Sequence, residues 1–459
     1  MVTAGRRPFT HAETGTPEAR WHERPEWGQV IPVPAPATTG ASRLVVVAAH
    51  PDDETLAAGG LMAVAAQAGL DVVVVLLTDG ERSHPDSRTM GEQELARHRV
   101  EESRQALGLL APAGRLERVG LPDGSLADHV DTVVTALVDV IGEDGGRTLL
   151  AAPWREDGHA DHDAAGLAAS VAARRTDATL WEYPVWLWHW CEPERAPWAT
   201  FRALPLPDDI REAKRAAVAL HRTQVAPLTE ATGDEAVLHD GMLEHFRRPF
   251  EVFLRLDPAA DDSLERLHDT SADPWRVRTS WYEERKRLVT LAALPHRRYP
   301  RALEVGGSVG ALAAELSRRC DELVVVDESA AATSAARASL DSDATDTGAV
   351  GDVSVLQASV PEDWPGGRFD LVVVSEVGYF LSPERLRRLV ARVDASLTDD
   401  GAVVLCHWRH PVRGWPLDGR RVHELWREHS VLPVIATHVE ADFRLDVFSR
   451  TTVHEAGSS

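Results

Sequence analysis

Two series of valine- and leucine-rich runs, each alternating with alanine-rich stretches, constrain the fold of this chain most strongly. The first series contains "RLVVVAA" at 43–49 and "LDVVVVLLTDG" at 70–80, separated by "ETLAAGGLMAVAAQAG". The second begins with "RALEVGGSVGALAAELSRR" at 301–319 and continues through "DELVVVDES" and "FDLVVVSEV". Continuous apolar strands of this kind are typical of parallel sheets covered on both faces by helices. The sequence therefore predicts an α/β protein with two doubly wound domains in tandem and mostly parallel sheets.

The length agrees with two domains, because 459 residues exceed what one hydrophobic core usually supports. We divide the chain into an irregular N-terminal arm at 1–42, a Rossmann-like domain at 43–256, a linker at 257–272 and a second Rossmann-like domain at 273–459. The arm is rich in Pro, Gly and Thr and the linker in Asp, Ser and Pro, so neither shows a regular apolar period.

Charge and cysteine content exclude several classes of function. The chain has 49 Lys and Arg against 72 Asp and Glu, a net charge of −23, which argues against a nucleic-acid partner. Its three cysteines lie far apart and predict neither disulfides nor a thiolate zinc site. No stretch resembles a signal peptide or a membrane span. We therefore expect a cytoplasmic enzyme, without membrane insertion, that acts on a small molecule.

Charged residues follow the first buried strand directly, in "HPDDE" at 50–54. In doubly wound sheets, ligands bind beyond the carboxyl ends of the strands, so this is where a site should lie. His50 and Asp53 can turn toward one point, and ligands of this kind suit Zn²⁺ or another divalent metal. Asp52, between them, can point elsewhere.

A catalytic zinc ion typically has three protein ligands, and the segment "APWREDGHADHDAAG" offers a third. It holds His159, Asp161, His162 and Asp163 beyond another predicted strand. Either cluster alone could be a turn or a helix cap. Together, at strand ends of one domain, they favour a metal site.

The motifs "AHPDDE" and "HADH", with a weaker match at "HRTQ" (221–224), resemble the LmbE-like or PIG-L family of zinc-dependent N-acetyl sugar deacetylases. The resemblance covers Arg43 to Arg255. It implies that His50, Asp53 and His162 bind the metal and that Asp52 is the general base. This is chemically coherent, because a zinc-bound water loses its proton readily to a neighbouring carboxylate.

Other polar and aromatic residues near these motifs have candidate roles. His159 is the candidate for stabilising the oxyanion or protonating the leaving amine, with Asp161 orienting or tuning it. Glu54 either contacts substrate or supports the loop at the start of the next helix. Five tryptophans at 181–198 could line a glycan site, but we prefer hydrophobic packing for the group.

A glycine-rich turn, "LEVGGSVG" at 303–310, opens the second domain. Gly306, Gly307 and Gly310 stand between a short strand and a helix, where nucleotide-like cofactors bind. Asp327 ends the next strand, about twenty residues on, where an acid can bind ribose hydroxyls. NAD is one interpretation of this pattern.

The ExGxxxG form at Glu304 to Gly310 instead resembles the first motif of class I methyltransferases that use S-adenosyl-L-methionine. With "DPWRVRTSWYEERK", "RRCDELVVVDES" and "SEVGYFL", the segment from Asp273 onward resembles the NodS-like N-methyltransferases, which act on amino sugars freed by a deacetylase. The resemblance implies that Asp327 binds the ribose and that the loop of Glu304, Gly306, Gly307 and Gly310 binds the amino-acid part of the donor. Ala358, with Ser359 or Trp364, would border the adenine.

The acceptor side of this second site is less well defined by the sequence. Methyl transfer to nitrogen needs an unprotonated amine in line with the methyl group, and a base can help. Glu376 is our candidate for that base, with Tyr379 and His407 as alternatives at predicted strand ends. His407 could equally be a packing residue. Gly378 stands where the family has a larger apolar residue.

The two resemblances together imply N-deacetylation of an N-acetylated amino sugar or glycoside, followed by N-methylation of the freed amine. Two alternatives stay open. One is the same deacetylase joined to an O- or C-methyltransferase for an unrelated acceptor. The other is a non-catalytic protein that binds metal and S-adenosyl-L-methionine, against which the intact set of His50, Asp52, Asp53 and His162 argues.

Overall fold

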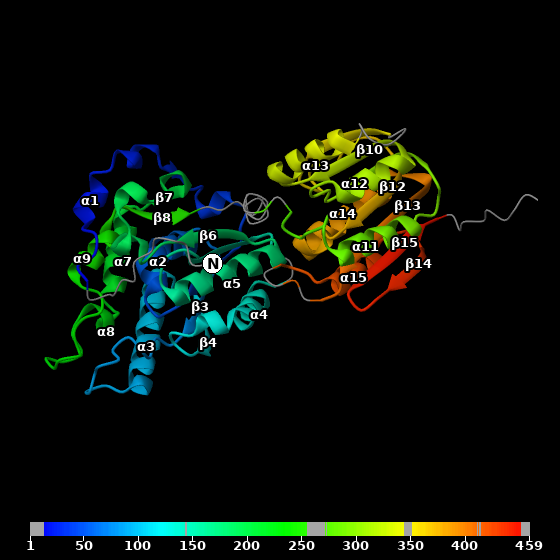
Figure 1. Ribbon diagram of the computed structural model, residues 1–459. Helices are drawn as coiled ribbons and strands as arrows, with labels where there is room; N and C mark the ends of the chain where they lie inside the picture. The colour runs from blue at the N-terminus through cyan, green and yellow to red at the C-terminus, as the bar shows by residue number, and fades with distance from the viewer. Residues whose placement is uncertain are drawn as a thin grey trace, which may run out of the picture. The chain divides into compact units, whose positions relative to one another are not determined.

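The computed structural model describes residues 13–142, 145–254, 271, 273–343, 351–410, 412 and 415–450. Contacts divide the chain into two compact units, Met1–Pro258 and Ala259–Ser459. Each unit is an α/β structure with interleaved strands and helices (Figure 1), which confirms the predicted fold class. Apart from residue 271, the linker expected at 257–272 lies outside the described residues.

The first unit is built on an eight-stranded sheet with the order β1-β7-β8-β6-β5-β2-β3-β4. Its strands are β1 (Ile31–Pro32), β2 (Arg43–Ala48), β3 (Asp71–Thr78), β4 (Arg115–Leu121), β5 (Thr148–Pro153), β6 (Thr179–Tyr183), β7 (Phe201–Pro205) and β8 (Phe250–Leu254). Strands β2 to β6 pair in parallel, whereas β8 runs antiparallel to both β6 and β7.

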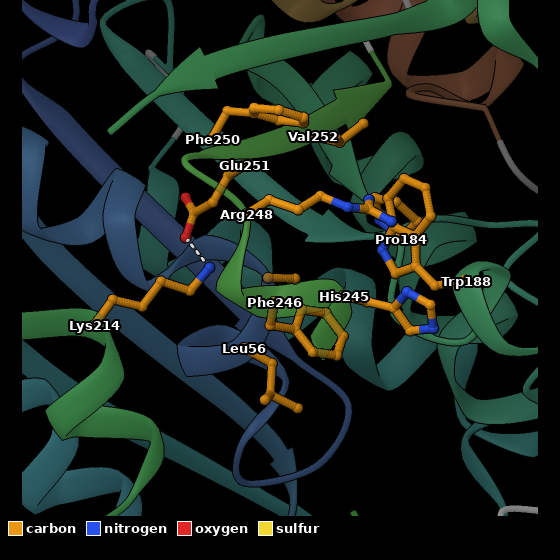
Figure 2. Close-up of a pocket in the computed structure, with 11 residues that line it drawn as sticks. Leu56, Pro184, Trp188, Lys214, His245, Phe246, Arg248, Phe250, Glu251 and Val252 are labelled. Atoms are coloured by element: carbon orange, nitrogen blue, oxygen red, sulfur yellow. Dashed lines mark hydrogen bonds and ion pairs between the residues drawn. The ribbon is translucent and has the colours of Figure 1, made fainter. Parts of the chain in front are cut away.

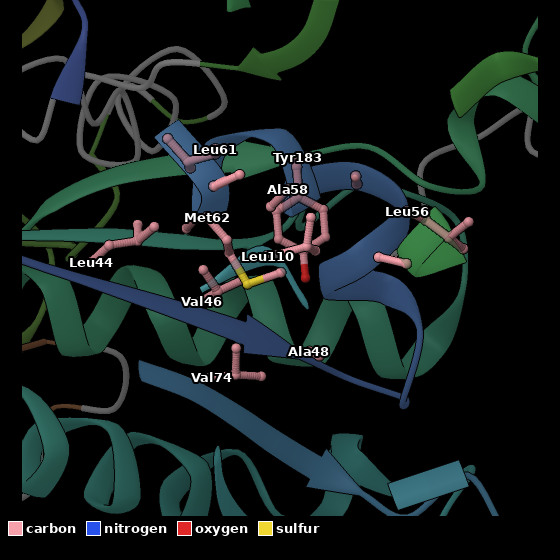
Figure 3. Close-up of a cluster of buried hydrophobic side chains, with 14 of the residues drawn as sticks. Leu44, Val46, Ala48, Leu56, Ala58, Leu61, Met62, Val74, Leu110 and Tyr183 are labelled. Carbon is pink, nitrogen blue, oxygen red and sulfur yellow. The ribbon is translucent and has the colours of Figure 1, made fainter. Parts of the chain in front are cut away.

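Helices cover both faces of this sheet. The longer ones are α2 (Asp53–Gln67), α3 (Glu92–Leu110), α4 (Val130–Ile141), α5 (Ala160–Thr176) and α7 (Asp208–Val218). Leu44, Val46 and Ala48 of β2 pack with α2, α3 and α7, as Figure 3 shows in part, while Val45 and Val47 pack with α4 and α5. Both faces of β2 are therefore buried, which explains its unbroken apolar run.

The described part of the expected N-terminal arm, 13–42, packs on the first unit. It forms α1 (Glu18–His22), two 3₁₀ turns, η1 (Pro25–Gln29) and η2 (Pro36–Thr38), and strand β1. Trp21 is fully buried, and Glu18 forms ion pairs with His245 and Arg248. This segment is less irregular than its composition suggests, because single aromatic and charged side chains fix it where no apolar period exists.

The second unit contains a seven-stranded sheet with the order β11-β10-β9-β12-β13-β15-β14. Its strands are β9 (Tyr299–Val305), β10 (Cys320–Asp327), β11 (Asp352–Gln357), β12 (Phe369–Ser375), β13 (Leu397–Trp408), β14 (Val434–Val439) and β15 (Phe443–Ser449). The first five pair in parallel, and β15 runs antiparallel to β13 and β14. The strand order reverses beside β9, which is where a doubly wound sheet binds its ligand.

The helices of this unit are α11 (Trp281–Ala292), α12 (Ala311–Leu316), α13 (Ala330–Asp343), α14 (Pro383–Ser396) and α15 (Gly419–His429). Helices α14 and α15 share one apolar cluster with the sheet, and α11 and α12 share the other. Among all the helices described in the two units, none has the length and apolar character needed to cross a membrane.

Candidate active sites

The predicted metal ligands meet at the carboxyl edge of the first sheet. Strands β2 and β5 are parallel neighbours, so the segments that follow them lie side by side. His50 follows β2, Asp53 begins α2, and His162 lies in the first turn of α5. Nε2 of His162 is 3.3 Å from Oδ1 of Asp53, and Nδ1 of His50 is 3.6 Å from Oδ2 of the same carboxylate. The structure thus brings all three residues together.

Hydrogen bonds orient the two imidazole rings. Nδ1 of His162 is 2.8 Å from Oδ2 of Asp157, and Nε2 of His50 is 3.1 Å from Oδ1 of Asp123. Because carboxylates only accept, these nitrogens carry the ring protons. The opposite nitrogens face Asp53, and they would offer their lone pairs to an ion bound between these side chains, as metal-binding histidines do. The sequence reasoning did not pair these histidines with Asp157 or Asp123, although Asp157 lies in the quoted histidine-rich segment.

This donor set fits a divalent metal ion. Two imidazole nitrogens and a carboxylate are common ligands of catalytic zinc. Nε2 of His162 is buried and has no hydrogen-bond partner among the described residues, as expected of an atom that binds an ion. The ligand atoms of His50, His159 and His162, and those of His50, Asp123 and Asp161, also lie within 4.8 Å of one another.

Asp52 lies beside this centre and is held by an arginine. Nη2 of Arg99 is 3.1 Å from Oδ2 of Asp52 and 2.7 Å from the carbonyl oxygen of Pro51. Burial raises the pKa of Asp52 to about 7, although the charge of Arg99 acts to lower it. Its φ of 133° is unusual for a residue other than glycine. Arg99 was not singled out in the sequence, because an arginine within an amphipathic helix carries no separate signal.

His159 faces the same centre. Its ring centroid is 5.0 Å from those of His50 and His162, and the Trp186 ring is stacked at 6.3 Å. Burial, followed by the charges of His50 and His162, lowers the pKa of His159 to about 3. Trp186 is therefore the tryptophan of the 181–198 stretch that the structure places against a predicted site residue.

The carboxylate of Asp161, which was predicted to orient or tune His159, binds other groups, although its charge acts to raise the pKa of His159. That carboxylate accepts hydrogen bonds from the amides of Gly124 (2.7 Å) and Leu126 (3.0 Å) and lies 3.3 Å from Nε2 of His50. The backbone amide of Asp161 donates a hydrogen bond to Nδ1 of His159 at 3.3 Å. Helix α5 begins between these residues, which turns the Asp161 side chain toward His50.

The remaining candidates of this unit have structural contacts. Glu54 is buried and accepts a hydrogen bond from the amide of Asp52 at 3.1 Å, which supports the loop. Trp181 and Trp188 are buried in apolar clusters, as the preferred packing interpretation expects. His221, from the "HRTQ" motif, is buried 2.9 Å from the hydroxyl of Thr55 in α2.

A pocket elsewhere in this unit has its charged side chains paired (Figure 2). Lys214 is 2.7 Å from Glu251, and His245 and Arg248 both bind Glu18. The guanidinium of Arg248 lies 4.0 Å from the centroid of the Trp188 ring. We assign this pocket to packing and not to catalysis, because its charges satisfy one another.

The glycine-rich loop at 306–310, which was predicted to bind the methyl donor and is called the donor loop below, follows β9. Gly306 has a φ of +81°, and a Cβ atom there would lie 2.0 Å from Cγ2 of Val377. Gly307 is equally crowded, since its Cβ would lie 2.2 Å from Cγ1 of Val325. Only glycine permits so close an approach. The loop is therefore built on close packing between the ends of β9, β10 and β12.

Two acids border this loop. Asp327, at the end of β10, accepts hydrogen bonds from the amides of Ser308 (2.8 Å) and Ser329 (3.0 Å). Glu304 is buried in β9, and its Oε2 has no partner among the described residues. Burial raises the pKa of Glu304, so a charge there needs a cationic partner. These residues fit a donor that carries both ribose hydroxyls and an ammonium group.

An ion cluster lies beside the donor loop, directly after β12. Lys286 of α11 is buried, 2.7 Å from Oε1 of Glu376 and 2.9 Å from Glu283. Burial opposes its charge, but Glu376 and Glu283 outweigh that effect and raise the pKa of Lys286. The hydroxyl of Tyr379 donates a hydrogen bond to Oε2 of Glu376. Lys286 was missed in the sequence, although it stands in the "WYEERK" motif.

The other predicted residues of this unit are placed as follows. The amide of Ala358 donates to the carbonyl oxygen of Asp327 at 3.0 Å, beside the donor loop. His407 is fully buried, and its Nε2 accepts from the amide of Gly378 at 3.0 Å. A Cβ at position 378 would lie 2.5 Å from Cγ1 of Val422, which explains the glycine there by packing against α15.

Two segments of the chain match known family models. Residues 45–173 match the family model of GlcNAc-PI de-N-acetylase, PIG-L, and residues 258–417 match that of nodulation protein S, NodS. We call the units that contain these two matches the PIG-L domain and the NodS domain. The PIG-L match contains all three predicted metal ligands, and the NodS match contains the donor loop and Glu376.

Relatives of the PIG-L domain include a 1D-myo-inositol 2-acetamido-2-deoxy-alpha-D-glucopyranoside deacetylase from Rhodococcus erythropolis. It is 31% identical over 33% of this chain and 62% of its own length. A diacetylchitobiose deacetylase from Thermococcus kodakarensis is 32% identical over 27% of this chain and 46% of its own length. The chain thus spans about half to three-fifths of these relatives.

For the NodS domain, a similar solved structure is the N-methyltransferase NodS from Bradyrhizobium japonicum WM9 in complex with S-adenosyl-L-homocysteine. It has 23% identity and a TM-score of 0.37, and it covers 41% of this chain and 96% of that chain.

Proposed function

We propose that the chain is a bifunctional enzyme that deacetylates an N-acetylated amino sugar or glycoside and then methylates the freed amine with S-adenosyl-L-methionine. The convergence of His50, Asp53 and His162 on one point carries the hydrolytic half. The relatives of the PIG-L domain, whose names describe deacetylases of 2-acetamido sugars, support the substrate class.

A divalent cation, most suitably zinc, would be held by Nδ1 of His50, the Asp53 carboxylate and Nε2 of His162. Asp123 and Asp157 bind the opposite ring nitrogens and so keep both lone pairs turned inward. Once bound, such an ion polarises the acyl oxygen and lowers the pKa of a water molecule.

Asp52 is the proton acceptor for the attacking water. Arg99 holds one of its oxygens, which leaves the second for the proton. Water adds to the amide carbon, the C–N bond breaks, and the proton returns to the departing nitrogen, giving an amine and a carboxylate. His159, facing the same centre, donates a hydrogen bond to the developing oxyanion.

In the NodS domain, Asp327 would hold the ribose hydroxyls of S-adenosyl-L-methionine, and the glycine loop would hold its amino-acid part. Glu304, buried with an unpartnered oxygen, suits the ammonium group of that part. Once bound, this donor supplies an electrophilic methyl group.

The charges beside Glu376 favour an amine as the acceptor. Lys286 contributes one positive charge against the two negative charges of Glu283 and Glu376, so the cluster prefers a cation. The rings of Tyr282 and Trp408, in contact at 5.2 Å, add aromatic faces that attract ammonium groups. Glu376 would take the proton from the ammonium, which leaves an amine nitrogen able to accept the methyl group that the bound donor would supply.

Two variants of the full chain separate the activities. Asp52→Asn should lower acetate release from N-acetylated glucosamine derivatives by about 10²- to 10⁴-fold while keeping metal content and methyl transfer. Asp327→Ala should instead lower methyl transfer while keeping metal content and acetate release. Unchanged hydrolysis and metal content in Asp52→Asn would favour a non-catalytic binding protein, and methylation of hydroxyls but not amines would favour the O-methyltransferase alternative.

A further inference from the structure

Three buried polar side chains of the second unit have no part in the chemistry proposed above. They are Asp446 of β15, His423 of α15 and His407 of β13, and each is 0% exposed. Buried polar groups are costly unless they are hydrogen-bonded, so their arrangement calls for a reason.

Asp446 determines the proton position on His423. Its Oδ2 is 2.6 Å from Nδ1 of His423, and the same carboxylate also accepts from Arg427, Thr437 and Arg444. A carboxylate in such a setting only accepts, so Nδ1 of His423 carries the proton. Burial lowers the pKa of His423, which keeps the ring neutral and leaves a lone pair on Nε2. That Nε2 has no partner within the described part of the chain.

His407 has the complementary arrangement. Its Nε2 accepts from the amide of Gly378 at 3.0 Å, and an amide can only donate. Burial lowers the pKa of His407 well below its ordinary value, and the positive charge of Lys286 acts in the same direction, so its ring is also neutral. The ring proton therefore lies on Nδ1, a buried donor for which the described residues offer no partner.

The unpartnered donor and the unpartnered acceptor belong to neighbouring rings. The ring centroids of His407 and His423 are 5.3 Å apart, with the ring planes nearly perpendicular at 88°. One hydrogen bond between Nδ1 of His407 and Nε2 of His423, direct or through a single buried water, satisfies both atoms.

We propose that Asp446, His423 and His407 form a buried hydrogen-bond chain that holds the amide of Gly378 and thereby positions Tyr379 on the carboxylate of Glu376. Gly378 begins the turn η9 (Gly378–Phe380), which contains Tyr379. A Cβ at position 378 would lie 3.0 Å from Nε2 of His407, so glycine is what allows the amide to approach. Glu376 has a φ of +61°, a conformation that the surrounding contacts must stabilise.

All three members of the chain are positioning residues, because they act on Glu376 through Gly378 and Tyr379. The consequence for methyl transfer depends on the proposed function of the NodS domain. The hydrogen-bond chain itself does not, and it can be observed without any substrate.

The direct test is ¹⁵N NMR of the full chain with labelled histidine. We expect neutral rings protonated at Nδ1 for both His407 and His423. His423→Leu should shift the His407 nitrogen signals, whereas His423→Gln should restore them in part, because its amide can both donate to Asp446 and accept from His407. Thr437→Val is the matched control, since it removes a 2.8 Å hydrogen bond to Asp446 but leaves the histidines in place.

Methyl transfer gives the second measurement. His423→Leu should lower kcat by on the order of tenfold to a hundredfold with an unchanged Kd for S-adenosyl-L-homocysteine, and His423→Gln should recover most of the rate. A proton on Nε2 of His407, or His407 signals that His423→Leu leaves unchanged, would overturn the proposal. If the NMR result holds but no amine is methylated, the proposed function fails and the hydrogen-bond chain stands.

Discussion

Nδ1 of His162 lies 2.8 Å from Oδ2 of Asp157, and both side chains are fully buried. The backbone amides of residues 185–187 donate to the same carboxylate at 2.8–3.0 Å, so the turn after β6 holds Asp157 in place. The direction in which Nε2 of His162 faces Asp53 is therefore set by a loop that contains none of the predicted metal ligands.

We expect Asp157→Asn to weaken zinc binding by about 10- to 100-fold although all three ligands remain, because the asparagine amide no longer fixes the ring proton on Nδ1. Competition with a chromogenic chelator measures this affinity. Asp139→Asn, at an exposed site on α4, is the control and should bind zinc normally. Equal affinities for both variants would contradict the proposed orientation of His162.

In the donor loop, Gly306→Ala should weaken binding of S-adenosyl-L-homocysteine by about tenfold or more, since the added methyl group meets Val377 and the positive φ is itself unfavourable. Isothermal titration calorimetry of the full chain gives the affinity. Gly366→Ala provides a matched substitution, because nothing lies within 4 Å of a Cβ there. If Gly306→Ala bound the ligand like Gly366→Ala, the loop would not be the donor site.

In the ion cluster of Lys286, Glu283 and Glu376, the substitution Glu376→Gln removes one negative charge. Lys286 is then balanced by Glu283 alone. We expect a higher KM for a protonated amine and a lower kcat, with donor affinity unchanged. Steady-state kinetics at saturating donor separate the two parameters. A variant with wild-type kinetics toward amines would remove Glu376 from the mechanism.

The pair of Lys214 and Glu251 allows a test of stability. Glu251→Leu leaves Lys214 buried without its counter-ion and the amides of Gly60 and Leu61 without their acceptor. We expect the free energy of unfolding of the first unit to fall by about 3–5 kcal/mol in denaturant titrations followed by tryptophan fluorescence. Glu212→Ala, from an exposed ion pair with Arg215, should change it by less than about 0.5 kcal/mol.

Acid stability of the second unit should depend on Asp446. Burial opposes its charge, but hydrogen bonds from His423 and Arg427 outweigh that effect and lower its pKa below the ordinary 3.8. A lowered pKa means that the unfolded chain binds the proton first, so the stabilisation is complete above about pH 4 to 5 and is lost as the pH falls further. The lowered pKa of His423 acts in the same direction at higher pH.

Unfolding followed between pH 6 and pH 2 tests this dependence. Asp446→Asn should be less stable near neutrality and should lose less stability below pH 4 than the unaltered chain. Asp399→Asn, at an exposed carboxylate, should follow the unaltered chain throughout. A steep acid loss that persists in Asp446→Asn would place the responsible group elsewhere.

The central strands of both sheets could be predicted from the sequence because burial on both faces leaves an unbroken apolar run, as in β2 and β12. The edge strands β4 and β14 were not predicted, since most of their residues are exposed or half-buried and the apolar signal is lost. Strands β1 and β7 are too short for such a signal. Periodicity thus identifies the core of each sheet and misses most of its rim.

The meeting of His50, Asp53 and His162 was predictable because parallel neighbouring strands end at one edge. The partners that orient these groups were not, since Asp157 and Arg99 act through contacts that only the packed loops and helices create. The same holds for His423 and Asp446, whose pairing depends on an antiparallel strand returning beside α15. Gly378 appeared anomalous in the sequence because the side chains that exclude a Cβ there, Val422 and His407, approach it only in the folded unit.

Helix α2 begins with Asp53, and its amides of Gly60 and Leu61 donate hydrogen bonds to the carboxylate of Glu251 in β8, the last strand of the first unit. During synthesis on the ribosome, His50 and Asp53 therefore emerge long before Glu251, whose carboxylate binds the helix that Asp53 begins. A nascent chain arrested at residue 173, where the PIG-L match ends, contains His50 and His162 but lacks Glu251. The contacts of Glu251 with α2 and with Lys214 can consequently form only late in translation, when β8 has joined the sheet.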